Sequence, residues 1–484
     1  MAPKDFIVAI ELGSSKMTGI AGKKNLDGSI SVLAVVSEDS STFIRKGVIY
    51  NIDKTAQCIS SIVKRLTATL KTSISQVYVG VGGQSIRSLK NVIVKNLAAD
   101  TIVTQEMVNE LMDANRNMSY QDQEILDAAT QEYKVDNQYQ MDPVGIQCTR
   151  LEGNFLNILW RKMFYRNLNK CFDLAGVPIA EMYLAPLALA DSVLTDAEKR
   201  SGCALVDLGA DTTTVSVYYK NILRHLAVIP LGSNNITKDI ASLQMEESTA
   251  EEMKLKYGSA WTDNGEIDNN MSLSIDADRS VKSREFISIV EGRIEEIIEN
   301  VWYQVPSEYA DRLLGGIILT GGGSNMKNIE TAFRNHTHID KIRIAKFVTQ
   351  SISAKDPMIA AHNGTMNTIL GLLAKGDMNC AGAEVDANGD LFKEPKPAPV
   401  NPEREPRKAN ELSPGVIQTE AEKLKAEEER RRQEEEEAAR KAEEEAAEAA
   451  RKAEEEEKKK ENRKKTVGKL KNFFKNLIAE PEEE

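Results

Sequence analysis

Residues 10–25 read IELGSSKMTGIAGKKN, and residues 206–221 read VDLGADTTTVSVYYKN. The two stretches start 196 positions apart and share, in register, an acidic residue, a leucine, a glycine and later Thr, Lys and Asn positions. In each stretch an apolar run ends at the acid, and a run of alternating polarity follows the glycine. Alternation with a period of two is typical of a β-strand, so each copy predicts two strands joined by a tight turn. We therefore expect the same β-hairpin twice in this chain.

The turns of the two hairpins carry groups that suit a phosphate. The glycine of each turn would let the backbone come close to a ligand and direct N–H groups at an anion. The hydroxyls of Ser14, Ser15 and Thr212 add donors, and Lys16 adds positive charge. A single turn of this kind is more often an ordinary tight turn than a phosphate site. Two copies that face each other would hold a polyphosphate from both sides.

An acidic residue precedes the glycine of each turn by two positions. These residues are Glu11 and Asp207, and both fall where the first strand of their hairpin ends. Carboxylates at such a point can hold Mg²⁺ through water molecules. We therefore expect Glu11 and Asp207 to be the metal-binding residues.

A third element follows the same logic. Residues 316–320 form an apolar run that ends in Gly321, Gly322 and Gly323, and the next two residues, Ser324 and Asn325, are good helix caps. We expect a strand, a glycine turn and a helix over about 326–334. The N-terminus of a helix behind a glycine run is a natural seat for a nucleotide, although alone it is equally compatible with a packing turn.

Together these elements resemble the pattern of the actin-like ATPase superfamily, and within it the FtsA family of bacterial cell division proteins. The segments that carry the resemblance to FtsA are QEYKVDNQ at 131–138, PVGI at 143–146, LGSNNITKDIA from 231 and AEEMKLKYGSA from 250. The resemblance covers roughly residues 5–375. It implies an α/β fold with a duplicated, ribonuclease-H-like ATPase core around ATP and Mg²⁺, and an FtsA-specific inserted domain. Glu11 stands where the wider superfamily usually has Asp, and the expected activity is slow ATP hydrolysis at most.

The resemblance also implies a role for individual residues. The phosphates would be met from one side by Gly13, Ser14, Ser15 and Lys16, and from the other by Gly209, Ala210, Asp211 and Thr212. Asp207 and Glu11 would serve the metal ion, and Gly321 to Gly323 would lie against the base and sugar. Glu251 and Lys254 match a pair that contacts the nucleoside in this family. By themselves these two, three residues apart on a predicted helix, would indicate a surface ion pair.

The expected domain organisation has seven parts, of which the four subdomains are implied by the resemblance and the linker and charged stretch by composition. They are subdomain 1A (1–84, 165–195 and 351–375), the inserted subdomain 1C (85–164), subdomain 2A (196–232 and 310–350), subdomain 2B (233–309), a flexible linker (376–419), a charged single helix or disordered spacer (420–462) and an amphipathic membrane-targeting helix (463–479). Within subdomain 1C, residues 105–115 have a helical pattern and residues 154–160 a strand pattern.

The resemblance implies several partners. Subdomain 1C would make filament contacts between copies of the chain and contacts to later division proteins. Subdomain 2B would bind the C-terminal tail peptide of FtsZ, where Arg279 and Arg293 match basic positions of the family's pocket. Arginine suits the carboxylates of an incoming peptide, although isolated surface arginines usually have no such role.

Charge is distributed unevenly along the 484 residues. Residues 420–462 contain 18 Glu and 12 Lys or Arg, and they account for half of the net charge of −12. The remainder is mildly acidic, so nucleic acid is not expected as a partner. The charged stretch has strong helix formers and opposite charges at helical spacing, but Leu424 is its only large apolar residue. A coiled coil is therefore excluded, and a solvated single helix and a disordered spacer both remain open.

Cysteine usage and hydropathy favour the cytoplasm. The five cysteines lie far apart, with no CxxC pair that would indicate zinc or a disulfide framework. The first apolar run, residues 6–10, is too short for a signal peptide, and no run reaches the roughly 18 residues of a membrane span. We expect a cytoplasmic protein unless something attaches it to a surface.

Residues 463–478 read RKKTVGKLKNFFKNLI and provide such an attachment. Apolar side chains recur at three- and four-residue steps, at Val467, Leu470, Phe473, Phe474, Leu477 and Ile478. The other positions are rich in lysine, and no acid appears before Glu480. This pattern predicts a helix that lies in the surface of an anionic membrane. Docking of the helix on the body or on a partner is the alternative, which the long polar tether disfavours.

The prediction for function is an actin-like, ATP-binding cell division protein that polymerises at the cytoplasmic face of the membrane, at the division site. It would tether FtsZ filaments there and recruit later division proteins. The alternatives are a PilM-like pilus assembly ATPase and another actin-fold ATPase or kinase. A sugar kinase needs a general base in its cleft, and no candidate residue stands out in the sequence.

Overall fold

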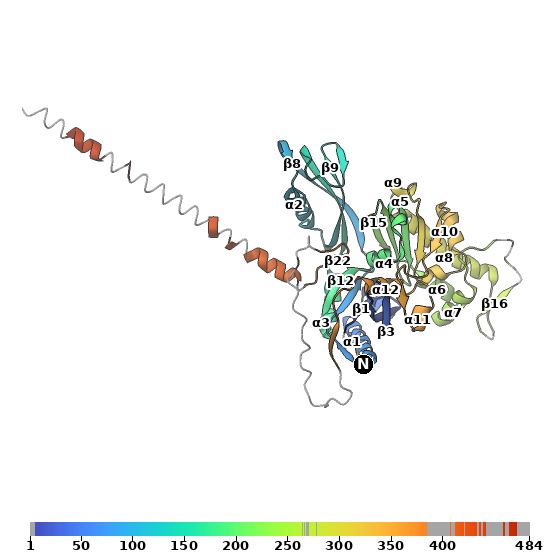
Figure 1. The fold of residues 1–484 in the computed structure, drawn as a ribbon. Helices are drawn as coiled ribbons and strands as arrows, with labels where there is room; N and C mark the ends of the chain where they lie inside the picture. Colours follow the sequence, from blue (N-terminus) through green and yellow to red (C-terminus); the bar gives the residue numbers. More distant parts are fainter. Residues whose placement is uncertain are drawn as a thin grey trace, which may run out of the picture. The chain divides into compact units, whose positions relative to one another are not determined.

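The computed structural model describes residues 5–384, apart from 264, 266, 268–270 and 277, and then 407, 412–420, 422–432, 435–436, 439–441, 458–459 and 464–471. The chain divides into two units, residues 1–419 and 420–484. The first unit is an α/β body built on two large sheets (Figure 1).

The first sheet has seven strands in the order β20-β3-β2-β1-β7-β12-β22. Their bounds are β20 (Ile352–Ser353), β3 (Ile30–Asp39), β2 (Lys16–Lys24), β1 (Ile7–Leu12), β7 (Val77–Val81), β12 (Ile179–Leu184) and β22 (Val416–Ile417). Strand β1 pairs antiparallel with β2 and parallel with β7. The sheet carries the first half of the body, which we call the first lobe.

The second sheet has nine strands in the order β10-β9-β11-β8-β15-β14-β13-β18-β19. Their bounds are β10 (Gln138–Gln140), β9 (Gln123–Val135), β11 (Gln147–Arg161), β8 (Arg87–Ile102), β15 (Ile222–Ile229), β14 (Thr213–Tyr219), β13 (Cys203–Leu208), β18 (Gly316–Thr320) and β19 (Ile342–Ile344). The last five strands of this order, β15, β14, β13, β18 and β19, carry the second lobe. Strands β8 to β11 belong to the inserted domain, which joins this sheet where Arg87 of β8 pairs with Ala227 of β15.

The predicted pair of hairpins is confirmed. In the first, β1 and β2 pair from Ile7↔Gly22 to Leu12↔Met17, and in the second, β13 and β14 pair from Cys203↔Tyr218 to Leu208↔Thr213. Each hairpin also has a parallel neighbour on the same side, β7 in the first lobe and β18 in the second. The two lobes are thus built around the same three-strand unit.

Helices pack on both sheets. They are α1 (Ile52–Leu70), α2 (Gln105–Arg116), α3 (Lys162–Ala175), α4 (Ala185–Val193), α5 (Asp196–Ser201), α6 (Ser233–Ala241), α7 (Glu247–Tyr257), α8 (Ser283–Gln304), α9 (Ser307–Ala310), α10 (Ile329–Thr337), α11 (Pro357–Ala360) and α12 (Asn367–Lys375). The smaller strands are β4 (Ile44–Arg45), β5 (Val48–Ile49), β6 (Thr72–Ile74), β16 (Ser272–Ser274), β17 (Ser280–Lys282) and β21 (Ala381–Glu384).

Helix α1 illustrates why these segments are helical. Asn51 caps it by accepting a hydrogen bond from the Lys54 N–H, and Ile59, Ile62 and Leu66 recur at helical spacing and are fully buried. Apolar periodicity of this kind fills three cores. The largest is centred on the first lobe and includes residues of the inserted domain and the second lobe, another lies in the second lobe, and a smaller one lies in the inserted domain. All five cysteines are buried and unpaired.

The inserted domain consists of β8 to β11 and α2, and its strands extend beyond the rest of the body in Figure 1. Helix α2 covers the stretch in which residues 105–115 predicted a helix, and β11 contains the strand predicted over 154–160. Both predictions are confirmed. Three polar side chains, Asn91, Asn115 and Asn157, connect β8, α2 and β11 by hydrogen bonds of 2.7–3.0 Å, and Asn115 and Asn157 are fully buried.

The prediction of a flexible linker over 376–419 is wrong for two segments. Residues 381–384 form β21, which pairs with β6, and residues 416–417 form β22, which pairs with β12 at the edge of the first sheet. The second pairing buries two apolar side chains, Val416 and Ile417. The prolines between these two segments favour an extended linker, and the segments themselves are too short to show a strand pattern in the sequence.

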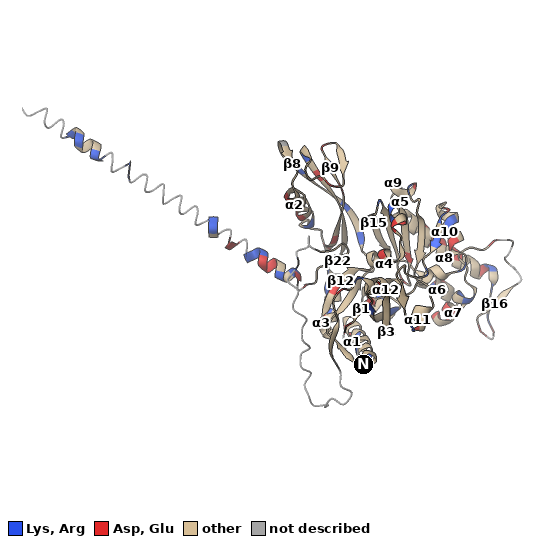
Figure 2. Cartoon of the chain, in the orientation of Figure 1, with Lys and Arg blue, Asp and Glu red and all other residues tan. Residues whose placement is uncertain are grey.

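In the second unit, residues 422–432, 439–441 and 464–471 are helical. Ion pairs at a spacing of four residues, Arg431 with Glu435 and Arg432 with Glu436, lie on the first of these stretches and just beyond it. Figure 2 shows mixed charges there and only basic charges on residues 464–471. Of the helices that the structure describes, none has the length and apolar character that crossing a bilayer requires.

Candidate functional site

A cavity of about 750 Å³ lies where the two hairpins and the glycine turn after β18 converge. This volume is within the range of small-molecule sites. The predicted site residues that line it are Glu11, Gly13, Ser14, Ser15, Lys16, Asp207, Gly209, Ala210, Thr212, Glu251, Lys254, Gly321, Gly322 and Gly323. Residues up to 312 positions apart in the sequence therefore share one cavity. That they bind a ligand there stays a prediction.

The two hairpin turns have the same close backbone approach. A Cβ atom on Gly13 would lie 2.5 Å from the carbonyl oxygen of Lys16, and one on Gly209 would lie 2.7 Å from the carbonyl oxygen of Thr212. Neither distance is compatible with a side chain, so both turns need glycine. In the second turn the Gly209 N–H donates to that carbonyl at 2.9 Å. The repeat in the sequence thus reflects a repeated backbone geometry.

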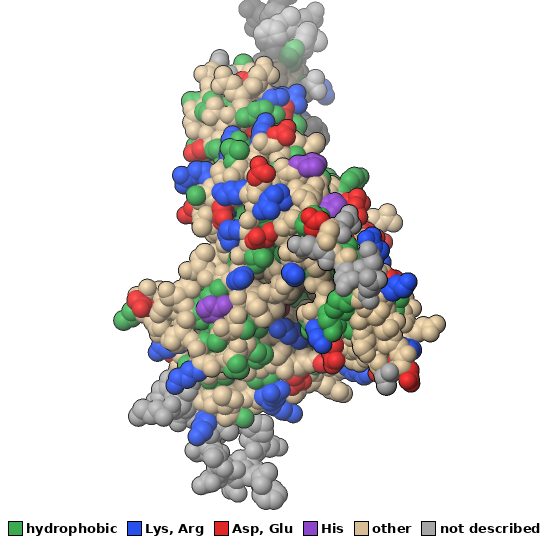
Figure 3. Space-filling view, turned by 90° about the vertical axis from the view of Figure 1, so that its right-hand side faces the viewer, with side chains coloured by type: hydrophobic (Ala, Val, Ile, Leu, Met, Phe, Trp, Pro, Cys, Tyr) green, Lys and Arg blue, Asp and Glu red, His purple; other side chains and the backbone are tan. Residues whose placement is uncertain are grey.

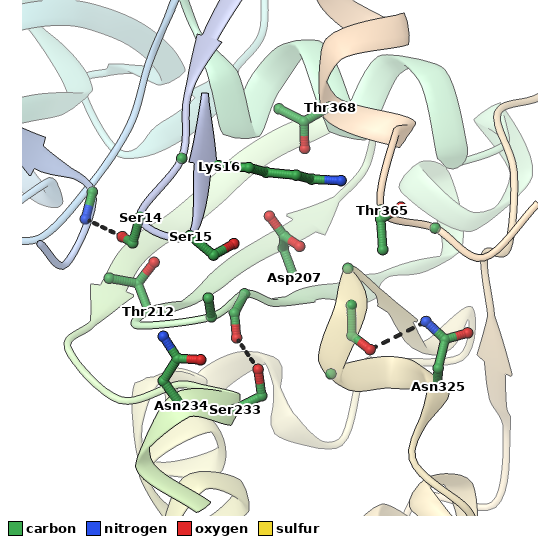
Figure 4. Close-up of a pocket in the computed structure, with 18 of the residues that line it drawn as sticks. Ser14, Ser15, Lys16, Asp207, Thr212, Ser233, Asn234, Asn325, Thr365 and Thr368 are labelled. Atoms are coloured by element: carbon green, nitrogen blue, oxygen red, sulfur yellow. Dashed lines mark hydrogen bonds between the residues drawn. The ribbon is translucent and has the colours of Figure 1, made fainter. Parts of the chain in front are cut away.

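The side chain of Lys16 extends across the cavity towards Thr368 and Thr365 (Figure 4). Its Nζ lies 3.9 Å from the thioether sulfur of Met366, and no carboxylate among the described residues forms an ion pair with it. A lysine inside a cavity with a thioether as neighbour keeps its charge available for an anion. Ser14, at the same turn, accepts a hydrogen bond of 2.7 Å from the Gly47 N–H.

Glu11 and Asp207 are the acidic side of the cavity. Burial, and then the negative charge of Asp207, raise the pKa of Glu11 to about 7, against a smaller opposite effect of Lys16. Burial raises the pKa of Asp207 to about 6. Both carboxylates are destabilised in their ionised form, and a bound cation would relieve this because it stabilises that form. The pair suits Mg²⁺ held through water, and within the described residues there is no cluster of three or more His, Cys, Asp or Glu side chains that would bind a metal directly.

The glycine run after β18 packs against the second hairpin. A Cβ atom on Gly321 would lie 2.3 Å from Oδ1 of Asp207, so this position also excludes a side chain. A helix was predicted over 326–334 with Ser324 and Asn325 as its N-terminal caps. The predicted start and the predicted caps are wrong. Ser324 Oγ donates to the Gly321 carbonyl at 2.7 Å, and Asn325 Nδ2 donates to the carbonyls of Gly322 at 3.1 Å and Asn363 at 2.8 Å.

Both polar side chains are therefore used within a short 3₁₀ turn, Gly322–Asn325, and cannot cap a following helix. Helix α10 begins only at Ile329, after a left-handed residue at Asn328. The result is a tight turn, rather than a helix N-terminus, at the floor of the cavity. Figure 4 shows the bond from Asn325 that closes this turn.

Glu251 and Lys254 on α7 form an ion pair of 2.6 Å in which the Glu251 side chain is 40% exposed and the lysine is buried. The Lys254 side chain is only 5% exposed, and its Nζ also donates to Thr237 Oγ1 at 2.8 Å and to the Ser233 carbonyl at 3.2 Å. The Thr237 hydroxyl in turn donates to Glu251 at 2.5 Å. This network ties α7 to α6 at the wall of the cavity, which rules out the plain surface pair.

Asp211 is the predicted phosphate residue that does not line the cavity. Its Oδ1 accepts a hydrogen bond of 2.8 Å from Asn234 Nδ2, and its Oδ2 accepts one of 3.2 Å from the Lys46 N–H. Lys46 belongs to the first lobe and Asp211 to the second. The carboxylate thus joins the two lobes beside the cavity.

Several lining residues were missed by the sequence analysis. They include Gly47, Gly82, Gly83, Ser233, Asn234, Asn325, Thr365 and Thr368. The run VYVGVGG at 77–83, an apolar strand that ends in glycines, was a signal of the same kind as the run after β18. Thr365 and Thr368 had no signal, because a threonine near a helix start is too common to single out.

Arg279 and Arg293 lie away from the cavity, in the segment predicted to be subdomain 2B. Arg279 pairs with Asp276 at 2.5 Å, and Arg293 makes a two-pronged contact with Asp239 at 2.5 and 3.1 Å and a further one with Glu296. A carboxylate of an incoming peptide would therefore compete with acids of this chain. On the face shown in Figure 3, basic and acidic side chains are interspersed over the described surface.

The predicted membrane-binding residues are described in part. Val467 and Leu470 lie on the helical stretch 464–471, where they are 61% and 51% exposed. Phe473, Phe474, Leu477 and Ile478 lie outside the described residues. The described part of the stretch also carries Lys464, Lys465, Lys469 and Lys471.

Comparisons with known proteins agree with one another. Residues 204–364 match the family described as "Cell division protein FtsA", and residues 83–159 match "SHS2 domain inserted in FTSA". FtsA of Porphyromonas gingivalis is 32% identical over 67% of this chain and 69% of its own length, and FtsA of Neisseria meningitidis serogroup B is 32% identical over 67% and 80%. The solved PilM-PilN type IV pilus biogenesis complex is similar in fold, with a TM-score of 0.53 at 13% identity over 77% of this chain and 98% of that one. The predicted fold class, an actin-like core with an FtsA-type inserted domain, is confirmed.

Proposed function

The chain belongs to the FtsA family of cell division proteins, and we propose that it is an ATP-dependent tether that holds FtsZ filaments at the cytoplasmic face of the membrane. The observation that carries the nucleotide part is the pair of opposed glycine turns around one cavity. The membrane part rests on the basic, amphipathic pattern of the last residues. The partner part rests on the family alone.

ATP would bind with its phosphates between the two turns. The backbone at Gly13, the hydroxyls of Ser15 and Thr212, and the ammonium of Lys16 would contact the phosphates. The Gly209 N–H already donates to the Thr212 carbonyl, so Gly209 would contribute by letting the backbone come close to the ligand. Mg²⁺ held by Glu11 and Asp207 through water would neutralise phosphate charge. The Glu251–Lys254 network and Gly321 to Gly323 would border the nucleoside. We propose that the nucleotide closes the two lobes and so controls assembly, with hydrolysis slow at most.

Membrane binding would occur through residues 463–479. Each basic residue near an anionic surface contributes on the order of 1 kcal/mol, to which burial of the apolar face is added. One such helix binds reversibly, but copies joined in a filament would bind together with high avidity. ATP-driven polymerisation would thus turn a weak anchor into a stable patch at the division site, where the inserted domain would contact neighbouring copies and later division proteins.

The FtsZ tail would bind in the segment 233–309, near Arg279 and Arg293. Both arginines are held by acids of α6, α8 and the turn before β17, which keeps their guanidinium groups oriented. A peptide that carries its own carboxylates would exchange partners with them rather than meet free charges.

The anchor is tested by liposome co-sedimentation of the full chain and of the Phe473→Glu variant. We expect the wild type to pellet with anionic vesicles and the variant to stay in solution with unchanged ATP affinity, because a charge on the apolar face opposes insertion. Leu424→Glu, in the charged stretch, is the control and should pellet like the wild type. Equal pelleting of Phe473→Glu and wild type would refute the anchor.

The partner is tested by adding FtsZ to the same assay, with the full chain and with a chain that ends at Lys460. We expect FtsZ to pellet only with the full chain. If the full chain pellets and FtsZ stays in solution, the anchor stands and FtsZ is the wrong partner. A PilM-like role would then be the better hypothesis, to which the fold similarity with the pilus complex lends support.

A further inference from the structure

Residues 412–418 return to the body and complete the edge of the first sheet. Strand β22 lies antiparallel to β12, with Ile417 opposite Met182 and Val416 opposite Tyr183, and the Leu184 N–H donates to the Gly415 carbonyl at 2.8 Å. Val416 and Ile417 are 3% and 1% exposed. The segment is therefore bound by both backbone pairing and apolar burial, as a docked peptide would be.

The same segment also contacts the inserted domain. The Gly415 N–H donates to Oδ2 of Asp127 at 2.8 Å, and Asp127 belongs to β9. This carboxylate is buried, and its other oxygen lies 3.8 Å from Arg116 of α2. Gly415 thus bonds with its carbonyl to the first lobe and with its amide to the inserted domain.

Gly415 is suited to this double role. Its φ of +84° lies in the left-handed region, and a Cβ atom there would meet Leu187 Cδ2 at 3.2 Å. Further along, the carbonyl of Gln418 accepts a hydrogen bond of 2.6 Å from the Tyr165 hydroxyl on α3. Upstream, Arg407 pairs with the buried Glu181 at 2.6 Å.

The inserted domain is held from its other side by the second lobe. Arg224 pairs with Glu132 at 3.2 Å, and Gln131 Nε2 donates to the Leu223 carbonyl at 2.9 Å. The inserted domain thus contacts both lobes. Its contacts to the first lobe include the hydrogen bond of 3.1 Å from Trp160 Nε1 to the Gln84 carbonyl, and residues 412–418 add a further link through Gly415. In Figure 1, β22 and β12 lie side by side at the base of the long strands of this domain.

We propose that residues 412–418 are a strap that locks the inserted domain to the first lobe and that can detach as a unit. The strap has one short paired strand and two buried side chains, so its local opening costs far less than unfolding of the body. Detachment would remove one of the links between the inserted domain and the first lobe, while the contacts of Trp160 with Gln84 and Phe164 would remain. We expect the part of the inserted domain around Asp127 to become more mobile.

A consequence follows if the C-terminal helix binds membrane, which rests on the function proposed above. With the strap docked, the tether to the membrane starts after residue 418. With the strap detached, residues 412–418 would join the tether, and the body could stand further from the surface. The contacts that hold the strap are all within the chain and involve neither nucleotide nor membrane, so docking of the strap is tested without them.

The test is hydrogen exchange on the full chain, with Ile417→Asp to expel the strap and Asp127→Ala to remove its acceptor in the inserted domain. We expect the amides of Leu184 and Gly415 to be protected in the wild type. In Ile417→Asp both should exchange on the order of 10-fold faster or more, together with amides of β9 near Asp127. Asp127→Ala should speed exchange at Gly415. Asp142→Ala is the matched control, since Asp142 also accepts a backbone hydrogen bond, from Val144, but lies far along the domain.

Two results would overturn the proposal. Unprotected Gly415 and Leu184 amides in the wild type would mean that the strap is not docked, and faster exchange of the strap with unchanged β9 amides would mean that it does not hold the inserted domain. A Met182→Cys, Ile417→Cys double variant checks which chain supplies the strand. These positions pair directly, at a Cα separation of about 5.5 Å or less that a disulfide can span. A bridge within one chain is expected, whereas a covalent dimer would show that a second copy provides the strap.

Discussion

The two hairpins share a backbone but differ in what their side chains do. In both turns a Cβ atom added to the glycine would lie only 2.5–2.7 Å from the carbonyl oxygen of the residue three positions later, so neither turn has room for a side chain. At that third position the first turn has Lys16, which crosses the cavity, and the second has Thr212, which contributes a hydroxyl. The backbone geometry is thus the same in both turns, whereas the positive charge at this position is present in the first turn and absent from the second.

The two turns also differ at the position before Lys16 and Thr212. The first turn has a hydroxyl, Ser15, where the second has Asp211, and the Asp211 carboxylate is bonded to Lys46 of the first lobe and to Asn234. An acid aimed at phosphates would repel them, and Asp211 does not line the cavity. The second turn therefore combines the close backbone approach seen in the first with a connection between the lobes.

Replacing the cation should have the largest effect. We expect Lys16→Met to weaken ATP binding roughly 10- to 100-fold, because a charged hydrogen bond contributes about 1.5–3 kcal/mol, whereas Thr212→Val should cost about 10-fold or less. Isothermal titration measures both. Lys23→Met, on the exposed end of the same strand, is the control and should bind normally. Equal losses in Lys16→Met and Thr212→Val would mean that the two turns are equivalent after all.

The half-buried acids that line the cavity, Glu11 and Asp207, predict a pH dependence of the nucleotide-free protein. Because the pKa of Glu11 rises from 4.5 to about 7 on folding, the folded chain keeps a proton that the unfolded chain loses, and stability falls between about pH 4.5 and 7. Glu11→Gln removes this loss, so its melting temperature should gain a few degrees, about 2 to 4 °C, on the wild type from pH 5 to 7.5. Asp207→Asn should show the same trend in a lower window, between about pH 4 and 6, because its pKa rises from 3.8 to about 6.

Thermal melts in EDTA without nucleotide measure these profiles, with Asp27→Asn as an exposed control. Parallel pH profiles for wild type and Glu11→Gln would contradict the burial of this carboxyl. Saturating Mg²⁺ and ATP should flatten the wild-type profile, since a bound cation stabilises the ionised form.

The bond between the lobes should have the smallest effect. We expect Asp211→Ala to change ATP affinity by less than about threefold, and to lower the melting temperature by about 1 to 3 °C, since two hydrogen bonds of ordinary strength are lost. Titration and melting of the same variant separate the two roles. A loss of affinity as large as that of Lys16→Met would show that Asp211 contacts the phosphates directly.

Much of the site was predictable because its pieces are local. A glycine between an acid-ended strand and an alternating strand is encoded within about 16 residues, and the repeat at 206–221 made the pattern visible. The start of α10 was not predictable in the same way. Ser324 and Asn325 have the chemistry of helix caps, but carbonyls of Gly321, Gly322 and Asn363 engage them first, and Asn363 lies 38 residues beyond Asn325.

The sequence by itself determined the hairpins and the glycine turn, because strand alternation and turn chemistry depend on near neighbours. Its resemblance to the FtsA family implied the inserted domain. Only the tertiary structure decided that Lys254 is buried, that Asp211 joins the lobes and that residues 412–418 dock on β12. Each of these depends on contacts between residues that are distant in the chain. Burial and hydrogen-bond partners of that kind are set by packing, which no local pattern contains.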